Sequence, residues 1–390
     1  FMVERLTTMR VGLPLALLMS GRVEESRAFL RAAQRKDRER LGPKHYRTAE
    51  KGGVLAMAHA AAGEDEQALA QFAEVLPVLL SRSRQSDDED SSAEARDHRL
   101  TLILESYMDV LARVRGGALE RKAGIDAAAE AFRLADVART RSVQRALAAS
   151  GARAAARNPD LADLARREQD AQKRISALYD ALAQVLGLPT DQRDQAAVDG
   201  LRTRIDTLRQ ARATLMEEIE ARFPDYAELI NSKPATVEAA RSNLRSGEAL
   251  IATYAGAEKT YLWAIPREGD VAFATADLGR EELADWVALL RSALEPKAQT
   301  LGDIPDFDVA RAHGLYRKLL EPVAAGWKDA ESLLVVAHGP LGYLPLSLLP
   351  TEAATLGPEA EPLFANYRRV PWLARTHAIT MLPSVASLNT

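Results

Sequence analysis

The spacing of apolar residues changes once along this chain, between Asn231 and Thr236. Before that point apolar residues recur every three or four positions, as on the buried face of an α-helix, and chain-breaking residues are few. After it, apolar and polar residues alternate over short runs, and all four Trp and twelve of the eighteen Pro lie there. Alternation with a period of two is typical of strands. The sequence therefore predicts a helical part followed by an α/β part.

The helical part contains a short sequence that recurs 42 residues later, at position 63 after position 21. The run Gly21–Ser26 recurs as Gly63–Ala68, and each copy lies between two apolar helical stretches. A glycine can end one helix, and small residues let the next helix approach closely. A third helix pair is expected over Leu100–Arg115 and Ile125–Ala138, after an acidic, serine-rich loop at Ser86–Ser92. The pattern resembles the tetratricopeptide repeat (TPR) in a long-helix form, and a generic set of helical hairpins is the alternative.

A different helical pattern is expected between Pro159 and Phe223, where Gly187-Leu188-Pro189 separates two long stretches. Each stretch carries a narrow apolar stripe, made of Leu161, Leu164, Ala171, Ile175, Leu178, Leu182 and Leu186 in the first and Val198, Leu201, Ile205, Leu208, Leu215 and Ile219 in the second. Such stripes predict an antiparallel, coiled-coil-like hairpin with a spacing or packing role.

The α/β part begins with three expected strands, Ala249–Tyr254, Tyr261–Pro266 and Val271–Thr275, which form a small antiparallel meander. Helices are expected at Arg280–Leu294 and Ala310–Ala325, strands at Leu333–Ala337 and Ala378–Leu382, and a helix capped by Ser384 from Val385 onward. The continuous apolar run Leu333–Ala337 suggests a strand buried on both faces. We therefore expect three parts: residues 1–158, 159–232 and 233–390.

The chemistry open to the chain is limited because it contains no cysteine. That composition excludes disulfides, thiolate metal sites and a cysteine nucleophile within these residues. The histidines are scattered over positions 45, 59, 98, 313, 338 and 377, no two at helical metal-ligand spacing, and no phosphate-binding loop or hydrolase motif occurs. No metal and no cofactor is therefore expected.

Membrane and nucleic-acid partners are not expected either. The formal charge of −4 gives no electrostatic reason for either partner, and the apolar run Val11–Met19 is too short to span a bilayer. That run could pass for a signal-peptide core, but Ser20-Gly21-Arg22 is a poor cleavage site. Arginines over 139–157 and 166–174 leave nucleic-acid binding as a third class of function, although in the hairpin they alternate with acids, as on solvated helix faces.

The densest run of unusual residues is Val335–Pro345, which begins in a predicted buried strand and ends in a Gly/Pro turn. Sites often form at the carboxyl end of a strand in an open α/β sheet, so His338-Gly339 could be a catalytic His leaving its strand. The alternative is that His338 hydrogen-bonds the turn while Gly339 and Gly342 supply positive φ angles. Without a nucleophile in the chain, we favour the turn.

Several of these motifs, in this order, resemble the front of a CHAT domain, the caspase-like domain found attached to TPR repeats. They are Ala131–Arg139, Phe223–Leu229, Leu244–Ile251 with Tyr254, Tyr261–Trp263, His338–Pro345 and Ala378–Ser384. The resemblance covers about residues 125–390. It implies a partial caspase-like α/β domain of a cysteine peptidase, in which a His-Gly and a Cys at the ends of two core strands carry the reaction.

The resemblance assigns no catalytic residue to this chain. His338 matches an earlier family position than the catalytic His, and nothing here matches the Cys. We expect the catalytic half beyond Thr390, where the α/β part stops short, and we expect the TPR-like repeats to bind a protein or peptide that activates cleavage of a protein substrate in the cytoplasm. The alternative is a non-catalytic scaffold for protein–protein assembly.

Overall fold

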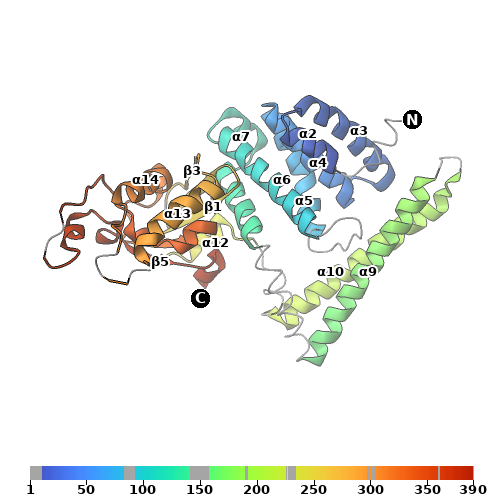
Figure 1. Cartoon of the computed structure of the whole chain (residues 1–390). Coiled ribbons are helices and arrows are strands. Elements are labelled where there is room, and N and C mark those ends of the chain that lie inside the picture. The colour runs from blue at the N-terminus through green and yellow to red at the C-terminus, as the bar shows by residue number, and fades with distance from the viewer. Residues whose placement is uncertain are drawn as a thin grey trace. The chain divides into compact units, whose positions relative to one another are not determined.

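The computed structural model describes residues 11–82, 93–140, 158–188, 192–224, 226, 234–296, 299–300, 304–358 and 361–389. The chain forms two compact units, one of residues 1–123 with 140–233 and one of residues 124–139 with 234–390. The first unit is helical and the second contains a five-stranded sheet (Figure 1). The predicted order, helices first and an α/β part after them, is confirmed.

The first unit opens with antiparallel helices whose turns repeat. They are α2 (Gly12–Met19), α3 (Val23–Leu41), α4 (Tyr46–Ala61), α5 (Asp65–Arg82), α6 (Ala93–Val114) and the short α7 (Ala118–Ala123). Gly21 (φ 80°) and Gly63 (φ 74°) both end a helix in the left-handed conformation. The next N–H then bonds back five residues in both copies, Arg22 to Leu17 O and Glu64 to His59 O, each at 2.9 Å. The two copies therefore share one Schellman turn.

Helix α4 is the centre of this bundle, and its glycines show how closely its neighbours approach. A Cβ atom on Gly53 would lie 2.7 Å from Ile103 Cδ1 on α6. On Gly52 it would lie 2.6 Å from Gln34 Nε2 on α3 and 2.7 Å from Val75 Cγ1 on α5. Helices α3, α5 and α6 thus approach the α4 backbone closely at its two glycines. Residues 46 and 48–59 of α4 are buried, and Arg47 is half-buried.

The expected third helix pair is only partly found. Its first member is α6, but its second, a helix over residues 127–140, belongs to the unit that contains the sheet. The acidic loop Ser86–Ser92 lies outside the described residues.

The predicted hairpin is present as α9 (Pro159–Gly187) and α10 (Gln195–Arg222), which run antiparallel (Figure 1). The side chains of Asn158 and Asp194 cap the two helix starts. The predicted stripes meet in two buried clusters, one centred on Leu161, Leu164, Ala165 and Ile219 and one on Leu182, Leu186, Val198 and Ile205. Local periodicity was sufficient to predict this element.

The sheet has the strand order β3-β2-β1-β4-β5. Its strands are β1 (Glu248–Ala255), β2 (Thr260–Pro266), β3 (Ala272–Ala276), β4 (Ser332–Val336) and β5 (Ala378–Met381). The first three form the predicted antiparallel meander, whereas β4 joins β1, and β5 joins β4, in parallel. Strand β1 is thus central, with an antiparallel neighbour on one side and a parallel one on the other.

Helices cover both faces of the sheet. One face carries Ala249 and Ile251 of β1 and packs on α13 (Arg280–Leu294) and α14 (Val309–Leu319). The other carries Tyr254 and Trp263, and the ring of Phe132 in helix 127–140 meets Trp263 edge-on at 5.9 Å. Helices on both faces are the usual way to bury a sheet that contains parallel strands.

Three differences from the predicted elements have local causes. The helix expected through Ala325 ends at Leu319 and continues as a 3-10 turn, Glu321–Gly326, because Pro322 supplies no N–H and disfavours helical backbone at the residue before it. Leu334 of β4 is only half-buried, so that strand is not covered equally on both faces. The residues after Ser384 form a 3-10 turn, Val385–Asn389, rather than an α-helix.

The remaining short elements lie around the sheet. Helix α12 (Val237–Ser242) precedes β1, and the 3-10 turns η4 (Gly339–Tyr343), η5 (Leu346–Leu348), η6 (Ala365–Arg369) and η7 (Leu373–Arg375) fill the connection from β4 to β5. Strand β5 is one of the two edge strands, and three of its four side chains are exposed, Met381 among them.

Candidate functional site

The run singled out in the sequence, His338-Gly339, lies where β4 leaves the sheet. Gly339 has a φ of 62°, as a tight turn at this point requires, whereas Gly342 is not among the residues with positive φ. The expectation of left-handed backbone was therefore right for Gly339 and wrong for Gly342. The 3-10 turn η4 starts at Gly339 and carries the chain away from the strand.

His338 is fixed against the end of the neighbouring strand β1. Its backbone N–H donates to Thr253 Oγ1 at 3.1 Å, and its ring Nδ1 accepts from the N–H of Ala255 at 3.2 Å. The imidazole also stacks on Tyr254, with ring centroids 4.5 Å apart and an interplanar angle of 4°. Three consecutive residues of β1 thus hold one histidine of the β4 turn.

Helix 127–140 also contacts the carboxyl end of β1. Arg139 Nη1 donates to Thr253 O at 3.5 Å, and its Nη2 lies 3.6 Å from Asp136 Oδ1. The other carboxylate oxygen of Asp136 accepts the N–H of Ala235 at 2.8 Å. We call Asp136, Arg139, Thr253, Tyr254, Arg280 and His338 the carboxyl-end cluster, since they surround the carboxyl ends of β1 and β4.

The electrostatics of this cluster keep His338 neutral. Burial lowers the pKa of His338 from 6.5 to about 4, and the positive charges of Arg139 and Arg280 add to that lowering. Arg280 itself donates from Nε and Nη2 to Ala255 O, at 3.1 and 3.0 Å. Burial also lowers the pKa of Arg139, while Asp136 and Tyr254 oppose that effect.

The geometry favours the turn interpretation of His338 over the catalytic one. A general base needs a ring nitrogen with a free lone pair. Nδ1 of His338 accepts the N–H of Ala255, so the neutral ring carries its proton on Nε2 and neither nitrogen has a free lone pair. The nearby hydroxyl of Thr253 accepts a hydrogen bond from the backbone N–H of His338, not from its imidazole ring. Within the described residues, His338 ties the end of β4 to the end of β1.

Sequence reasoning missed Asp136 and Arg139 as members of this cluster. It assigned Arg139 to an arginine-rich run, yet Arg139 is only 9% exposed and Asp136 only 5%. A signal was present, since Phe132, Asp136 and Arg139 recur at helical spacing on one face. A charged pair on an apolar stripe can mark a buried polar contact.

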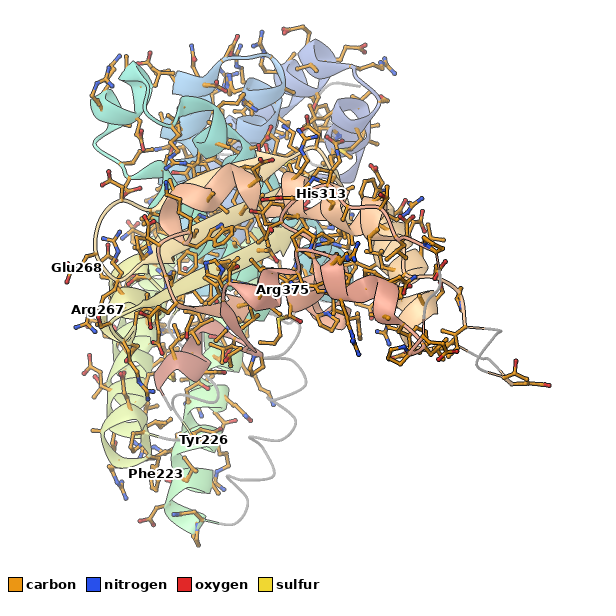
Figure 2. The ribbon with its side chains drawn as sticks, turned by 90° about the vertical axis from the view of Figure 1, so that its left-hand side faces the viewer. Phe223, Tyr226, Arg267, Glu268, His313 and Arg375 are labelled. Carbon is orange, nitrogen blue, oxygen red and sulfur yellow. The ribbon has the colours of Figure 1, made fainter. Side chains whose placement is uncertain are left out.

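Three of the other histidines, at positions 45, 59 and 313, have structural partners. His45 caps α4 by accepting the N–H of Arg47 at 3.2 Å, and His59 Nδ1 lies 2.5 Å from Glu64 Oε2 across the turn between α4 and α5. His313 of α14 is labelled in Figure 2, and its Nδ1 lies 3.0 Å from Pro350 O. Among the described residues no group of three or more His, Asp or Glu side chains is placed to hold a metal ion.

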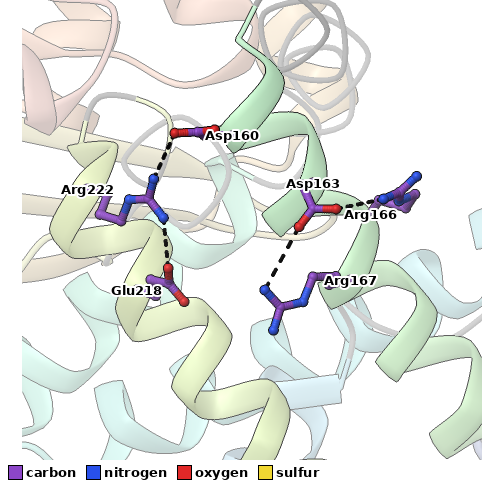
Figure 3. Close-up of polar contacts among 6 residues, drawn as sticks. All are labelled: Asp160, Asp163, Arg166, Arg167, Glu218 and Arg222. Atoms are coloured by element: carbon purple, nitrogen blue, oxygen red, sulfur yellow. Dashed lines mark hydrogen bonds and ion pairs between the residues drawn. The ribbon is translucent and has the colours of Figure 1, made fainter.

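The hairpin arginines lie among acids of the same helices (Figure 3). Arg166 pairs with Asp163 at 2.6 Å, and Arg222 bridges Glu218 and Asp160 at 2.8 and 3.0 Å. Paired, exposed charges of this kind are typical of solvated helix faces. Apart from Arg139 and Thr140, the arginine-rich run 139–157 lies outside the described residues.

Comparisons with protein family models, with curated proteins and with solved structures each find no match to this chain. None of the described helices is both long enough and apolar enough to cross a bilayer.

Proposed function

We propose that this chain is the partner-sensing region and the N-terminal part of a CHAT caspase-like cysteine peptidase. In this proposal the catalytic His and Cys lie beyond Thr390. The TPR-like repeats bind a protein or peptide, the intact protein then cleaves a protein substrate, and both events take place in the cytoplasm. The proposal assigns no catalytic role to any residue of this chain.

The observation that carries the proposal is the parallel run of β1, β4 and β5. Carboxyl ends of parallel strands meet at one edge of a sheet, where sites in α/β proteins form. In the described residues β5 is paired with β4 on one side, and its side chains are largely exposed. Two further parallel strands added to β5 would bring a His and a Cys from their ends to the edge that already holds His338.

The repeated Schellman turn supports the sensing role. Two helix pairs that share a turn stack in the same way, and stacked pairs are how solenoid proteins build an extended surface for a partner. Arg27 of α3 lies 2.5 Å from Glu64 in the second turn, so the first copy is tied to the second. These contacts support the proposal that the repeats form a rigid surface. We propose that this surface binds a protein or peptide.

The second candidate is a non-catalytic scaffold, in which the lack of cysteine in these residues would be a native feature of the domain. Under this reading the α/β unit would serve assembly, and His338 would be a structural residue of a degenerate domain.

Reading the gene past the codon for Thr390 separates the two candidates. A strand ending in His-Gly and a later strand ending in Cys favour the peptidase, whereas a stop codon favours the scaffold. The functional test is to purify the intact gene product with a protein that it captures and to follow cleavage by mass spectrometry. Replacing the downstream Cys by Ala should abolish cleavage, and cleavage that is absent, or unchanged in that variant, overturns the peptidase.

A further inference from the structure

A buried ion pair joins helix α3 to the start of α4. Lys51 Nζ lies 2.6 Å from Asp37 Oδ2, and both side chains are 4% exposed. Arg40 follows Asp37 by one turn on α3, and Arg47 precedes Lys51 by one turn on α4. Since residues three or four positions apart lie on the same face of a helix, the ion pair brings both guanidinium side chains to the same side of the α3–α4 turn.

The charges around this ion pair do not balance. Burial lowers the pKa of Lys51 and Asp37 opposes that effect, whereas Arg47 and Arg40 both add to the lowering. Within the residues that the structure describes, neither arginine forms an ion pair with a carboxylate. Both arginines are half-buried, so three cations share one carboxylate in a region where an unneutralised charge is costly.

Two polar groups near the ion pair have no hydrogen-bond partner among the described residues. Thr48, which follows Arg47 directly, is 3% exposed, and its buried Oγ1 makes no hydrogen bond to the protein. The buried Nε of Arg40 makes none either. Buried polar groups in proteins are nearly always hydrogen-bonded. Two such groups beside an excess of positive charge therefore indicate an acceptor that binds to the protein here.

The start of α4 points to the same kind of ligand. The N-terminus of a helix carries a partial positive charge, which acidic residues in the first turn commonly neutralise. Helix α4 has no acidic residue in its first turn and has Arg47 and Thr48 there instead. An anion bound at this helix start would take the place of the missing acidic side chain.

We call Arg40, Arg47, Thr48 and Lys51 the α4-start cluster, and we propose that it binds a phosphate group, either free or on a phosphorylated side chain. A phosphate group on a side chain carries a charge of about −1.5 to −2 at pH 7 and three acceptor oxygens. That charge matches the cations that Asp37 leaves unbalanced, and the oxygens can accept from the Thr48 hydroxyl and from Arg40 Nε. Guanidinium groups also pair with phosphate through two parallel hydrogen bonds. The whole cluster belongs to the helical unit, so the inference goes beyond the peptidase and scaffold proposals and depends on neither.

The test is isothermal titration calorimetry of the 390-residue chain with inorganic phosphate, at constant ionic strength with chloride as the background anion. The parent chain should bind phosphate saturably. Arg47→Gln should weaken binding by about tenfold or more, because it removes a charged donor. Arg38→Gln is the matched control, since Arg38 lies on α3, is exposed and pairs with Glu74 at 2.7 Å. In that variant the affinity should stay within about twofold of the parent value.

Thr48→Val separates a ligand site from a structural role. It keeps the shape of the side chain and removes the hydroxyl, so it should also weaken phosphate binding by about tenfold. Because the hydroxyl makes no hydrogen bond to the described residues, urea unfolding in chloride, followed at 222 nm, should show no loss of stability. A structural role alone would give the opposite pair of results, a loss of stability with unchanged phosphate affinity. This variant also serves as the test if Arg47→Gln does not fold.

Two peptides identify the source of the phosphate group. One carries a phosphoserine between two alanines on each side, and the other carries a serine in its place. A phosphopeptide that binds at least as tightly as inorganic phosphate assigns the site to a phosphorylated protein, and weaker or absent binding of that peptide assigns the site to the free ion. The proposal is overturned if the parent chain binds neither inorganic phosphate nor the phosphopeptide saturably. It is equally overturned if Arg47→Gln and Thr48→Val bind phosphate as tightly as Arg38→Gln does.

Discussion

Trp263 Nε1 on β2 donates a hydrogen bond to the carbonyl oxygen of Ala128, which lies 135 positions earlier in the chain, at 3.0 Å. Both residues are buried, and Phe132, one turn further along the same helix, meets the indole edge-on. This contact joins a helix that precedes the hairpin to a strand that follows it. It makes helix 127–140 part of the sheet unit.

Trp263→Phe should destabilise the sheet unit by about 2–3 kcal/mol, because it removes a buried hydrogen bond and leaves a small cavity. Trp286→Phe is the matched control, since Trp286 is half-buried and contacts Arg311 and Lys318 through its ring face. It should cost less than about 1 kcal/mol. Urea unfolding followed by the fluorescence of the three remaining Trp checks both values, and equal losses would contradict the role of the Ala128 bond.

Asp37→Asn should destabilise the helical unit by about 3–5 kcal/mol, since it leaves the buried ammonium of Lys51 without its counter-charge. Lys51 Nζ lies 2.6 Å from Asp37 Oδ2, and both side chains are 4% exposed. Burial lowers the pKa of Lys51, Asp37 opposes that effect, and Arg47 and Arg40 add to the lowering. The double change Asp37→Leu with Lys51→Met should cost much less, because no buried charge remains.

The chain has a built-in control for the Asp37 experiment. All four Trp belong to the sheet unit, at positions 263, 286, 327 and 372, so their fluorescence reports that unit, whereas circular dichroism at 222 nm is dominated by the helices. Asp37→Asn should move the circular dichroism transition to lower urea and leave the fluorescence transition in place. A double variant as unstable as Asp37→Asn would contradict the explanation by buried charge.

His338 should make the sheet unit less stable in mild acid. Its pKa is about 4 in the folded chain and 6.5 when exposed, so above pH 6.5 both states are neutral and the stability is complete. As the pH falls from 6.5 to about 4, the unfolded chain takes up a proton that the folded chain does not, and up to about 3 kcal/mol is lost. Below that range the loss from this residue does not increase.

The measurement for His338 is the free energy of unfolding at pH 7 and pH 4.5, from Trp fluorescence in urea. His338→Asn retains an oxygen that can accept the Ala255 N–H but does not titrate, so its stability should change less between the two pH values. Arg139 and Arg280 are present in both proteins, so the difference between the two reports His338. The same pH dependence in parent and variant would show that His338 is not the group responsible.

Gly53→Val should destabilise the helical unit by about 1–3 kcal/mol, because its side chain would overlap Ile103 in a packed core. Gly200→Ala in α10 is the matched control. Nothing lies within 4 Å of a Cβ atom at Gly200, so that change should stabilise the hairpin by about 0.5–1 kcal/mol through helix propensity alone. Thermal unfolding followed at 222 nm measures both, and a neutral Gly53→Val would contradict the close approach of α4 and α6.

Much of the secondary structure could be predicted because its causes are local. The paired turns at Gly21 and Gly63 need only a glycine after an apolar helix, and the α9–α10 hairpin needs only two stripes and a break between them. The meander β1–β2–β3 follows from short runs of strand length joined by tight turns, but β1 and β2 are buried on both faces rather than on alternate residues. The position of the His338-Gly339 turn after a buried strand was likewise evident from the run of apolar residues before it.

The candidate site could be predicted only in part. The sequence pointed to His338 and to hydrogen bonding in its turn, but it could not supply the partners, since Thr253, Tyr254 and Ala255 lie more than 80 positions away. It also treated Arg139 as one arginine in a solvated run, whereas packing on the sheet buries it.

The sequence by itself determined which segments are helices and strands and which of their faces are apolar, because hydrophobic periodicity and turn residues act over a few positions. Only the tertiary structure decided what those faces bury. It placed helix 127–140 on the sheet rather than leaving it to complete a third repeat pair, and it set β1 between an antiparallel and a parallel neighbour. An apolar stripe indicates that a face is buried but not which surface covers it. The covering surface depends on shape and on polar contacts between distant residues, such as the hydrogen bond between Asp136 and Ala235.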